Sequence, residues 1–377
     1  MKRVEKEPAK RLENQPEKKR MKKPAKIALI ALLALLVLGG SVFGYIHSKL
    51  RLIDYDDGKP DTEQTGQDGD KTRQAEKEQI QRIIDGDDPD VQAQQDAMEE
   101  AVQELEVVSW TPPMSEMEIL HDDNVINILL IGTDERSDGF SSSARGDSIM
   151  ILSLNKATGS AKLVSLERAI GVPILSGQYQ GQWDWLTHTF AYGGADLMLR
   201  EVRECFRVDV ERYIRVNFNT FRQGIEAIGG VDITISQAEA DYLNRELNAT
   251  GYFAGTNHMS GWGALSYARC REIDSDWTRI QRQRTVIQAA INATRGLSVG
   301  ELDNLLNSVL PLVRTNLTEG EILSLLTLAP RFQGVTLSQR TIPASGTYGG
   351  MRGMGGRYLY APDFDANAKI LRDFLYG

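Results

Sequence analysis

The middle of this chain contains short, nearly continuous runs of apolar residues. Three of these runs predict buried β-strands, at residues 125–131, 148–154 and 161–166. Farther along, the apolar residues recur at helical spacing instead. This second pattern predicts helices over residues 276–296, 301–314 and 318–331.

Charged residues stand at the ends of all three predicted strands. Asp134 follows the first strand, Asp147 precedes the second and Arg168 follows the third, with Arg136 and Arg145 nearby. The ends of apolar strands are where α/β proteins build their sites. Two carboxylates with several arginines suit a magnesium–phosphate complex, because carboxylate oxygens bind the metal and guanidinium groups balance the remaining charge. Paired surface salt bridges are the alternative interpretation.

Five arginines fall between residues 269 and 284. Arginine is always charged, and its planar fork of donors suits phosphate or carboxylate. Arg269 and Arg271 precede a turn, whereas Arg279 lies at the start of the helix that begins near Asp276. Arg279 and Gln283 share one face close to the helix N-terminus, which favours anions. We predict that these side chains converge on one anion; a basic, solvated helix face is the alternative.

The N-terminal residues predict a membrane anchor. Residues 1–26 hold 11 Lys/Arg and 4 Glu, and residues 27–46 carry no charge. About 20 apolar residues span a bilayer. A cleavable signal peptide is the alternative, but the apolar and basic regions are both long and no clear cleavage site follows. We expect a single transmembrane helix over residues 27–47 in the cell membrane, with residues 1–26 cytoplasmic and the rest outside.

Residues 48–120 are predicted to be an acidic extracytoplasmic linker. Residues 52–120 contain 20 Asp/Glu but only 5 Lys/Arg. Apolar residues between Arg73 and Glu106 recur with a helical period that residues 85–89 interrupt, so a helical stalk or partner-binding hairpin is the alternative. The remaining domain, residues 121–377, is close to neutral. Because a general nucleic-acid binder is basic overall, we expect no nucleic-acid partner.

Several motifs within residues 123–296 resemble, in order, those of LytR-CpsA-Psr proteins. They are Asn127-Ile-Leu-Leu-Ile-Gly-Thr-Asp134, Arg145-Gly-Asp147-Ser-Ile-Met, Ser165-Leu-Glu-Arg168, Ala191-Tyr-Gly-Gly194, Gly229-Gly230-Val-Asp232, Tyr267-Ala-Arg269-Cys-Arg271 and Asp276-Trp-Thr-Arg279-Ile-Gln-Arg282-Gln283. The resemblance implies an α/β/α sandwich with a central mixed β-sheet in residues 121–377, behind the transmembrane helix and the linker.

The resemblance also implies a function in cell-wall assembly. Such proteins are phosphotransferases that move a glycopolymer, such as teichoic acid or capsular polysaccharide, from a polyprenyl-pyrophosphate carrier onto peptidoglycan. An apolar pocket holds the lipid. The implied partners are therefore the lipid-linked glycopolymer, peptidoglycan and, through residues 27–47, the bilayer.

The family's functional residues match particular positions of this chain. Asp134 and Asp147 correspond to the aspartates that bind Mg²⁺ (or Mn²⁺). Asp276 corresponds to an acidic residue that organises the arginines and assists deprotonation, so it is a candidate catalytic residue together with Arg279. The residues that correspond to pyrophosphate-binding positions are Arg168, Arg269, Arg271, Arg279 and Gln283.

The chain departs from the family pattern at three positions. Glu167 and Ala169 stand where the family has proline and aspartate, and Trp185 stands where it has a lysine. We expect Arg136 or Arg145 to point into the pocket and partly replace that lysine. Because of these departures, two alternatives to transfer remain: a pyrophosphatase, and an envelope or regulatory protein that binds polyprenyl pyrophosphates.

Overall fold

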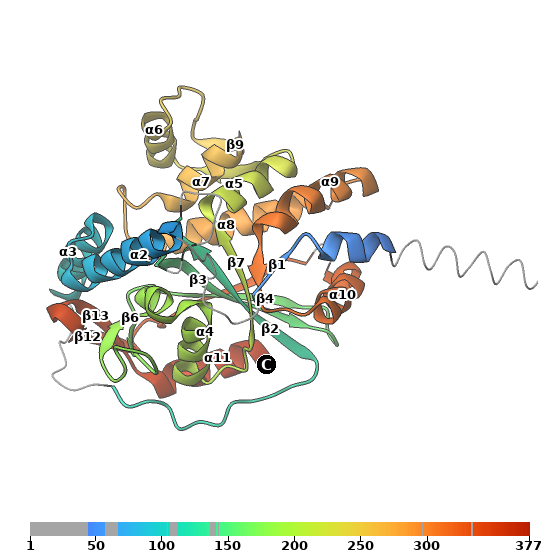
Figure 1. Ribbon diagram of the computed structural model, residues 1–377. Coiled ribbons are helices and arrows are strands. Elements are labelled where there is room, and N and C mark those ends of the chain that lie inside the picture. The colour runs from blue at the N-terminus through green and yellow to red at the C-terminus, as the bar shows by residue number, and fades with distance from the viewer. Residues whose placement is uncertain are drawn as a thin grey trace, which may run out of the picture. The chain divides into compact units, whose positions relative to one another are not determined.

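A computed structural model describes residues 44–56, 67–103, 105, 112–135, 141, 143–295, 297–332 and 335–377. Residues 49–377 form one compact unit, and the fold below is that of this unit (Figure 1). The predicted membrane helix lies, apart from residues 44–47, outside the described residues. In the part that is described, no helix combines the length and the apolar character needed to cross a membrane.

The centre of the unit is a seven-stranded mixed sheet, in the order β1-β10-β7-β2-β3-β4-β11. The three predicted strands are present as neighbouring antiparallel strands, with β2 pairing β3 and β3 pairing β4. The pairs β2–β7 and β4–β11 are parallel, which confirms the expected mixed sheet. The strands are β1 (Asp54–Tyr55), β2 (Val125–Thr133), β3 (Gly146–Asn155), β4 (Ala161–Leu166), β7 (Arg212–Asn217), β10 (Arg314–Thr315) and β11 (Ser338–Ile342).

Both faces of the sheet are covered, which explains why its strands are continuously apolar. Successive side chains of a strand point to opposite faces. In β3, Ile149 and Ile151 join the core under α4 (Leu186–Phe206) and α11 (Phe364–Tyr376), whereas Met150 packs in a second core with Ile287 of α8 (Asp276–Thr294). Helices on both faces give the expected α/β/α layering, which Figure 1 shows with α4 and α11 together on one side.

A smaller group of elements extends from the α8 side of the sheet and has its own apolar core. A two-stranded hairpin is the centre of this group, and three helices pack around it. The elements are α5 (Phe218–Ala227), β8 (Val231–Ile235), α6 (Gln237–Glu246), β9 (Gly255–Met259) and α7 (Gly261–Arg269). Cys270 is buried in this core and Cys205 in the core under α4, and both are free thiols.

The remaining described elements are two helices at one end of the sheet and two short strand pairs at the other end. The helices predicted over residues 301–314 and 318–331 are present as α9 (Val299–Val309) and α10 (Glu319–Leu328), each continued by a 3-10 turn. Two short antiparallel pairs lie at the other end: β5 (Gly171–Pro173) with β6 (Trp183–Trp185), and β12 (Tyr348–Arg352) with β13 (Tyr358–Pro362).

The expectation of a solvated linker is wrong for residues 67–103. These residues form two helices, α2 (Gln67–Asp85) and α3 (Pro89–Gln103), whose apolar side chains are buried against β12, β13 and Trp185. The helical period in the sequence was therefore a true core pattern, and residues 86–88 are the turn between the helices. We refer to α2, α3 and this turn as the N-terminal hairpin.

A buried arginine fixes the N-terminal hairpin to the domain. Arg357 is 1% exposed, and its guanidinium group donates to the backbone carbonyls of Ile83 and Ile84 at the end of α2. Asp88 accepts the backbone N–H groups of Asp90 and Val91 and so caps α3. These contacts hold the acidic turn at a fixed place beside the end of β2 and the start of β3.

Candidate functional site

A pocket lies where the strand ends of the central sheet meet α5, α7, α8 and the turn of the N-terminal hairpin. Its volume is about 410 Å³, and its two ends differ in character. One end is apolar and is formed by Leu130, Met150, Ile214, Val216, Phe218, Phe221, Leu265, Ala268 and Ile287. The other end is charged and is formed by Asp88, Asp90, Asp134, Arg145, Asp147, Arg269, Arg271, Arg279 and Gln283.

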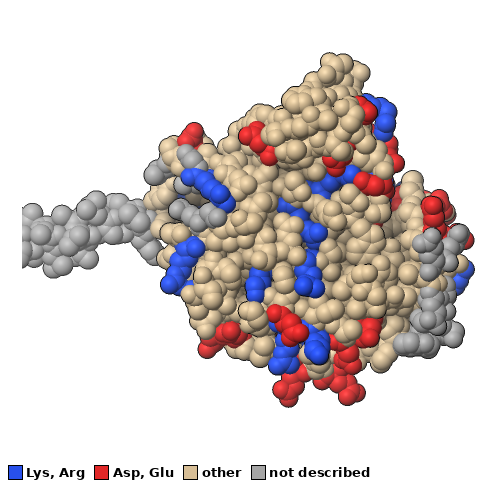
Figure 2. All heavy atoms as spheres, turned by 180° about the vertical axis from the view of Figure 1, so that it is seen from behind, with Lys and Arg blue, Asp and Glu red and all other residues tan. Residues whose placement is uncertain are grey.

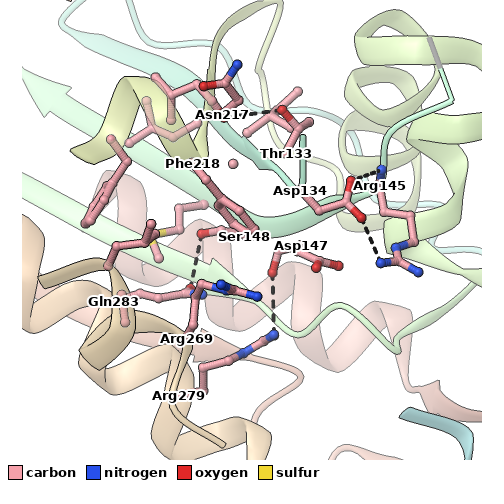
Figure 3. Close-up of a pocket in the computed structure, with 18 of the residues that line it drawn as sticks. Thr133, Asp134, Arg145, Asp147, Ser148, Asn217, Phe218, Arg269, Arg279 and Gln283 are labelled. Carbon is pink, nitrogen blue, oxygen red and sulfur yellow. Dashed lines mark hydrogen bonds and ion pairs between the residues drawn. The ribbon is translucent and has the colours of Figure 1, made fainter. Parts of the chain in front are cut away.

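Figure 3 shows the charged end in detail, with Asp134 and Asp147 on one side and Arg269, Arg279 and Gln283 facing them. Arg269 marks the boundary between the two ends, because its guanidinium carbon lies 4.6 Å from the centre of the Phe218 ring. Basic side chains also gather in the middle of one whole face of the molecule, with acidic ones towards its edges (Figure 2). An anionic group attached to an apolar chain suits a pocket of this kind.

The sheet register brings Asp147 and Arg168 together. Ile149 of β3 pairs with Leu166 of β4; Asp147 stands two residues before Ile149 within β3, and Arg168 two residues after Leu166, just past the end of β4. The distance between Arg168 Nη1 and Asp147 Oδ1 is 3.4 Å. Arg168 is 5% exposed, so this contact lies beneath the surface of the site.

Arg168 also connects the sheet to the first turn of α8. Its Nε lies 3.3 Å from Asp276 Oδ2, which accepts in addition from Arg279 Nη2 at 2.9 Å. Burial alone would raise the pKa of Asp276, but Arg168 and Arg279 outweigh it and hold this pKa well below its usual value. Asp276 is therefore an ionised group that fixes the two arginines in place.

The two predicted metal ligands line the same pocket but differ in their environment. Burial would raise the pKa of Asp147, yet Arg168 and Arg145 keep it lowered. For Asp134, burial and the nearby charge of Asp147 raise the pKa to about 6, although Arg145 opposes the shift. The negative charges of Asp134 and Asp147 repel each other. A cation bound between them would reduce this repulsion.

This donor set fits Mg²⁺ or Mn²⁺ bound together with a phosphate. Magnesium is held by one or two carboxylates and completes its shell with water and phosphate oxygens. Among the described residues, no group of three or more His, Cys, Asp or Glu side chains is arranged to hold a metal by itself. The two aspartates therefore suit a metal that arrives with its substrate, rather than a permanently enclosed metal.

Arg145 points to the pocket, but its charge is already shared among three carboxylates. It lies 2.6 Å from Asp88, 3.0 Å from Asp90 and 2.7 Å from Asp134 (Nη1 or Nη2 to Oδ). Arg271 contacts the same turn, with Nη2 3.4 Å from Asp90 Oδ1. The other proposed substitute for the missing lysine, Arg136, lies outside the described residues.

The pocket includes two residues that sequence reasoning missed, Asp88 and Asp90. Both line its charged end, but the acidic composition of their segment was typical of a linker. The interrupted helical period around residues 85–89 was the one available signal, because it marks a turn between two amphipathic helices.

The five clustered arginines serve two different purposes. Arg269, Arg271 and Arg279 line the pocket. Arg282 instead pairs with Glu239 and Asp274 and donates to the carbonyl of Cys270. Arg284 donates to Thr341 Oγ1 and the Arg340 carbonyl beneath α8. Gln283 lines the pocket as predicted, with its side-chain oxygen 3.1 Å from Ser148 Oγ.

The three departures from the family pattern lie in apolar or buried surroundings. Trp185 is 1% exposed, packs against the N-terminal hairpin and donates from Nε1 to the Tyr358 carbonyl at 2.7 Å. It is not among the residues that line the pocket. Ala169 is fully buried, and Glu167, 1% exposed, lies beside Asp276.

Comparison with solved structures supports the fold. TagT bound to LIIa-WTA aligns with a TM-score of 0.54 and 24% identity, over 71% of this chain and 98% of TagT. The protein gbs0355 from Streptococcus agalactiae aligns with a TM-score of 0.56 and 23% identity, over 67% of this chain and 88% of that one. Both confirm the mixed α/β architecture.

Sequence comparison adds relatives with named activities. The polyisoprenyl-teichoic acid–peptidoglycan teichoic acid transferase TagU of Bacillus mycoides is 33% identical over 202 residues, which are 52% of this chain and 62% of TagU. TagU of Oceanobacillus iheyensis is 32% identical over 222 residues, 56% of this chain and 64% of that protein. The match thus spans less than two thirds of these relatives.

The family profile matches much more of the chain than these pairwise comparisons do. It covers residues 89–373, from the start of α3 into α11, and so includes every residue of the charged end of the pocket except Asp88. By this match the chain belongs to the LytR_cpsA_psr family, that of the LytR-CpsA-Psr proteins.

Proposed function

We propose that this protein transfers a glycopolymer from a polyprenyl-pyrophosphate carrier onto peptidoglycan. The observation that carries the proposal is the two-ended pocket, in which an apolar wall continues into a cluster of arginines and aspartates. The transferase names of the TagU relatives support the same reaction. Teichoic acid is the polymer that those names indicate, and other envelope glycopolymers share its phosphate linkage.

Different residues of the pocket would bind the lipid, bind the phosphates and orient the arginines. The apolar end holds the lipid, and Arg269, at the boundary, meets the first phosphate. Arg271, Arg279 and Gln283 bind the remaining pyrophosphate oxygens and stabilise the charge that develops during transfer, whereas Arg168, which does not line the pocket, supports them from behind through Asp147 and Asp276. Because Asp276 is ionised and binds protons poorly, its main role is to orient Arg168 and Arg279.

The reaction then proceeds by displacement at phosphorus. A hydroxyl oxygen of the acceptor attacks the phosphorus that carries the polymer, its bond to the polyprenyl phosphate breaks, and the hydroxyl proton leaves to a base or to water. A Mg²⁺ or Mn²⁺ ion held by Asp134 and Asp147 supplies charge neutralisation on the phosphates. Positioning and charge, rather than a covalent nucleophile, are the protein's contribution.

A second candidate is binding or hydrolysis of the lipid pyrophosphate without transfer. The observation in its favour is that Arg145 is already paired with Asp88, Asp90 and Asp134, so its charge is shared and not available to replace the lysine in whose place Trp185 stands. Incubating the full chain with a radiolabelled lipid-linked polymer, peptidoglycan and Mg²⁺ separates the candidates. Polymer bound to peptidoglycan supports transfer; free polyprenyl phosphate with no bound polymer supports hydrolysis; a retained, unchanged donor supports binding alone.

The proposed location follows from the sequence. Residues 1–26 are cytoplasmic, residues 27–47 cross the membrane, and the acidic segment from residue 48 and the domain of residues 121–377 are extracytoplasmic. This arrangement would place the pocket where peptidoglycan is assembled. A cysteine introduced at Gly66 should react with a membrane-impermeant thiol reagent in intact cells, and protection of that cysteine would reverse the topology.

A further inference from the structure

A buried carboxyl group lies directly behind the candidate catalytic cluster. Glu167 follows β4 and is 1% exposed. Its Oε2 accepts the backbone N–H of Ala169. Its Oε1 is equally buried, and no N–H or O–H donor of the described residues reaches it.

The side chain of Glu167 has another carboxylate, that of Asp276, as a neighbour. The side chains of Glu167 and Asp276 lie within hydrogen-bonding reach of each other. Two ionised carboxylates repel strongly at such a distance, whereas a protonated one donates its O–H to the other. A proton on Glu167 therefore satisfies both the buried oxygen and Asp276.

The distribution of charge indicates which of the two groups holds the proton. Asp276 accepts from Arg168 and from Arg279, so its ionised form is stabilised. Burial, and then the charge of Asp276, raise the pKa of Glu167 well above its usual value. The aromatic rings of Trp277, Tyr348 and Tyr360 pack against one another, and Tyr348 and Tyr360 are near enough to Glu167 for its charge to raise their pKa values.

We propose that Glu167 is a protonated positioning residue that donates a hydrogen bond to Asp276 and thereby fixes Asp276, Arg168 and Arg279 for phosphoryl transfer. The inference rests on the proposed transfer function and assigns a role to a position where this chain departs from its family. With Glu167, Asp276 receives three donors: Glu167 and Arg168, which both follow β4, and Arg279 of α8. Loss of the Glu167 donor would leave Asp276 free to rotate between the two arginines.

The choice of substitution separates a hydrogen-bonding role from a packing role. In Glu167→Gln the amide N–H₂ still donates to Asp276 and the amide oxygen still accepts from Ala169, so transfer should stay close to that of the wild type. In Glu167→Ala both contacts are lost. We expect kcat to fall about 10–100-fold, the usual effect of removing a group that orients a functional one, with KM for the lipid donor little changed.

The pH profile gives a second readout that a packing role would not change. Ionisation of Glu167 at high pH would place two negative charges together and disturb Asp276, so wild-type transfer should fall at alkaline pH. The Gln variant cannot ionise and should lose this decline. The charged and titratable groups that face Glu167 are Arg168, Asp276, Arg279, Tyr348 and Tyr360.

Infrared spectroscopy tests the proton without relying on activity. At neutral pH the wild-type full chain should show the C=O stretch of a protonated carboxyl group that Glu167→Gln removes. Glu201→Gln is the matched control: Glu201 is also buried and protonated, but on α4 under the other face of the sheet, so its replacement should remove a similar band and leave transfer unchanged.

The outcomes distinguish this inference from the proposed function. A wild-type protein that transfers no polymer contradicts the proposed function, while the infrared difference still reports on Glu167. Equal kcat values for wild type and Glu167→Ala, with melting temperatures unchanged, would overturn the positioning role. Identical alkaline limbs in wild type and Glu167→Gln, or no protonated band lost on that substitution, would overturn the protonated state.

Discussion

Two buried carboxyl groups on the pocket side of the central sheet and one under its other face have pKa values shifted in opposite directions. On the pocket side, Asp147 and Asp276 are paired with arginines, which lower their pKa values despite burial. On α4, Glu201 is fully buried and forms no ion pair with the residues that the structure describes, and burial raises its pKa to about 8. The difference shows that burial alone does not create an anion site; the buried arginines do, because they keep carboxylates ionised inside the protein.

The largest effect is expected from removing a pocket arginine. Arg279→Ala should lower the transfer rate about 100-fold, because one preorganised charge is lost where negative charge develops. Arg279→Lys should restore little, since an ammonium group cannot replace a planar fork. The rate is measured as polymer attached to peptidoglycan. Arg295→Ala, at the far end of α8, is the matched control, and equal rates for the two Ala variants would remove Arg279 from the site.

A smaller loss is expected when the charge of an aspartate proposed to bind the metal is removed. Asp134→Asn keeps an oxygen that accepts the backbone N–H of Arg145, so the local fold should persist. Transfer should fall about 10–100-fold, and a higher Mg²⁺ concentration should be needed for half-maximal rate. Titrating Mn²⁺ in the presence of pyrophosphate, followed by its electron paramagnetic resonance, reports binding directly. Unchanged Mn²⁺ affinity in this variant would contradict the metal assignment.

Two arginines of the same cluster, Arg279 and Arg282, should differ in effect: replacing Arg282 should lower stability without lowering the rate of transfer. Its side chain is 3% exposed and bridges Glu239 and Asp274. Arg282→Ala leaves these carboxylates without their partner and should lower the free energy of unfolding by about 3 kcal/mol, because breaking a buried pair strands its charges. Urea unfolding measures this change. Transfer per folded molecule should match the wild type, and a rate loss as large as that of Arg279→Ala would contradict the division.

The smallest effect is expected on the opposite face and only at alkaline pH. The folded-state pKa of Glu201 lies at about 8, above its unfolded value near 4.5, so the neutral carboxyl favours the folded state. This stability is fully present below about pH 4.5 and is lost as pH rises towards 8. Glu201→Gln removes the loss. Its melting temperature should therefore equal that of the wild type near pH 5 and exceed it near pH 8.5; a constant difference at all pH values would contradict the shift.

Much of the fold could be read from periodicity. The runs at residues 125–131, 148–154 and 161–166 became β2, β3 and β4 because a sheet covered on both faces needs apolar residues at every position. The helix predicted from residue 276 is α8, which begins at Asp276 and ends at Thr294. These patterns depend on local spacing, which the sequence displays directly.

The sequence predicted those site residues whose charge stands out at the end of an apolar strand or at the start of a helix. Asp134, Asp147 and Arg279 drew notice as charges at element ends, and they line one pocket. Arg282 and Arg284 have the same composition signal but pair elsewhere, because their partners lie on other elements that the sequence does not place. Asp88 and Asp90 also line the pocket, but the sequence did not single them out, because they lie in an acidic segment whose composition is typical of a linker.

The register between β3 and β4 has a consequence for how this protein matures. A slip of one residue would turn Arg168 to the opposite face of the sheet, away from Asp147 and from the start of α8. The strands are close in sequence and can pair early, but Asp276 follows Arg168 by more than 100 residues and can dock only when that register is correct. The charged end of the pocket can therefore form only in a chain whose β3–β4 register is correct, and we expect a chain with the wrong register to be inactive.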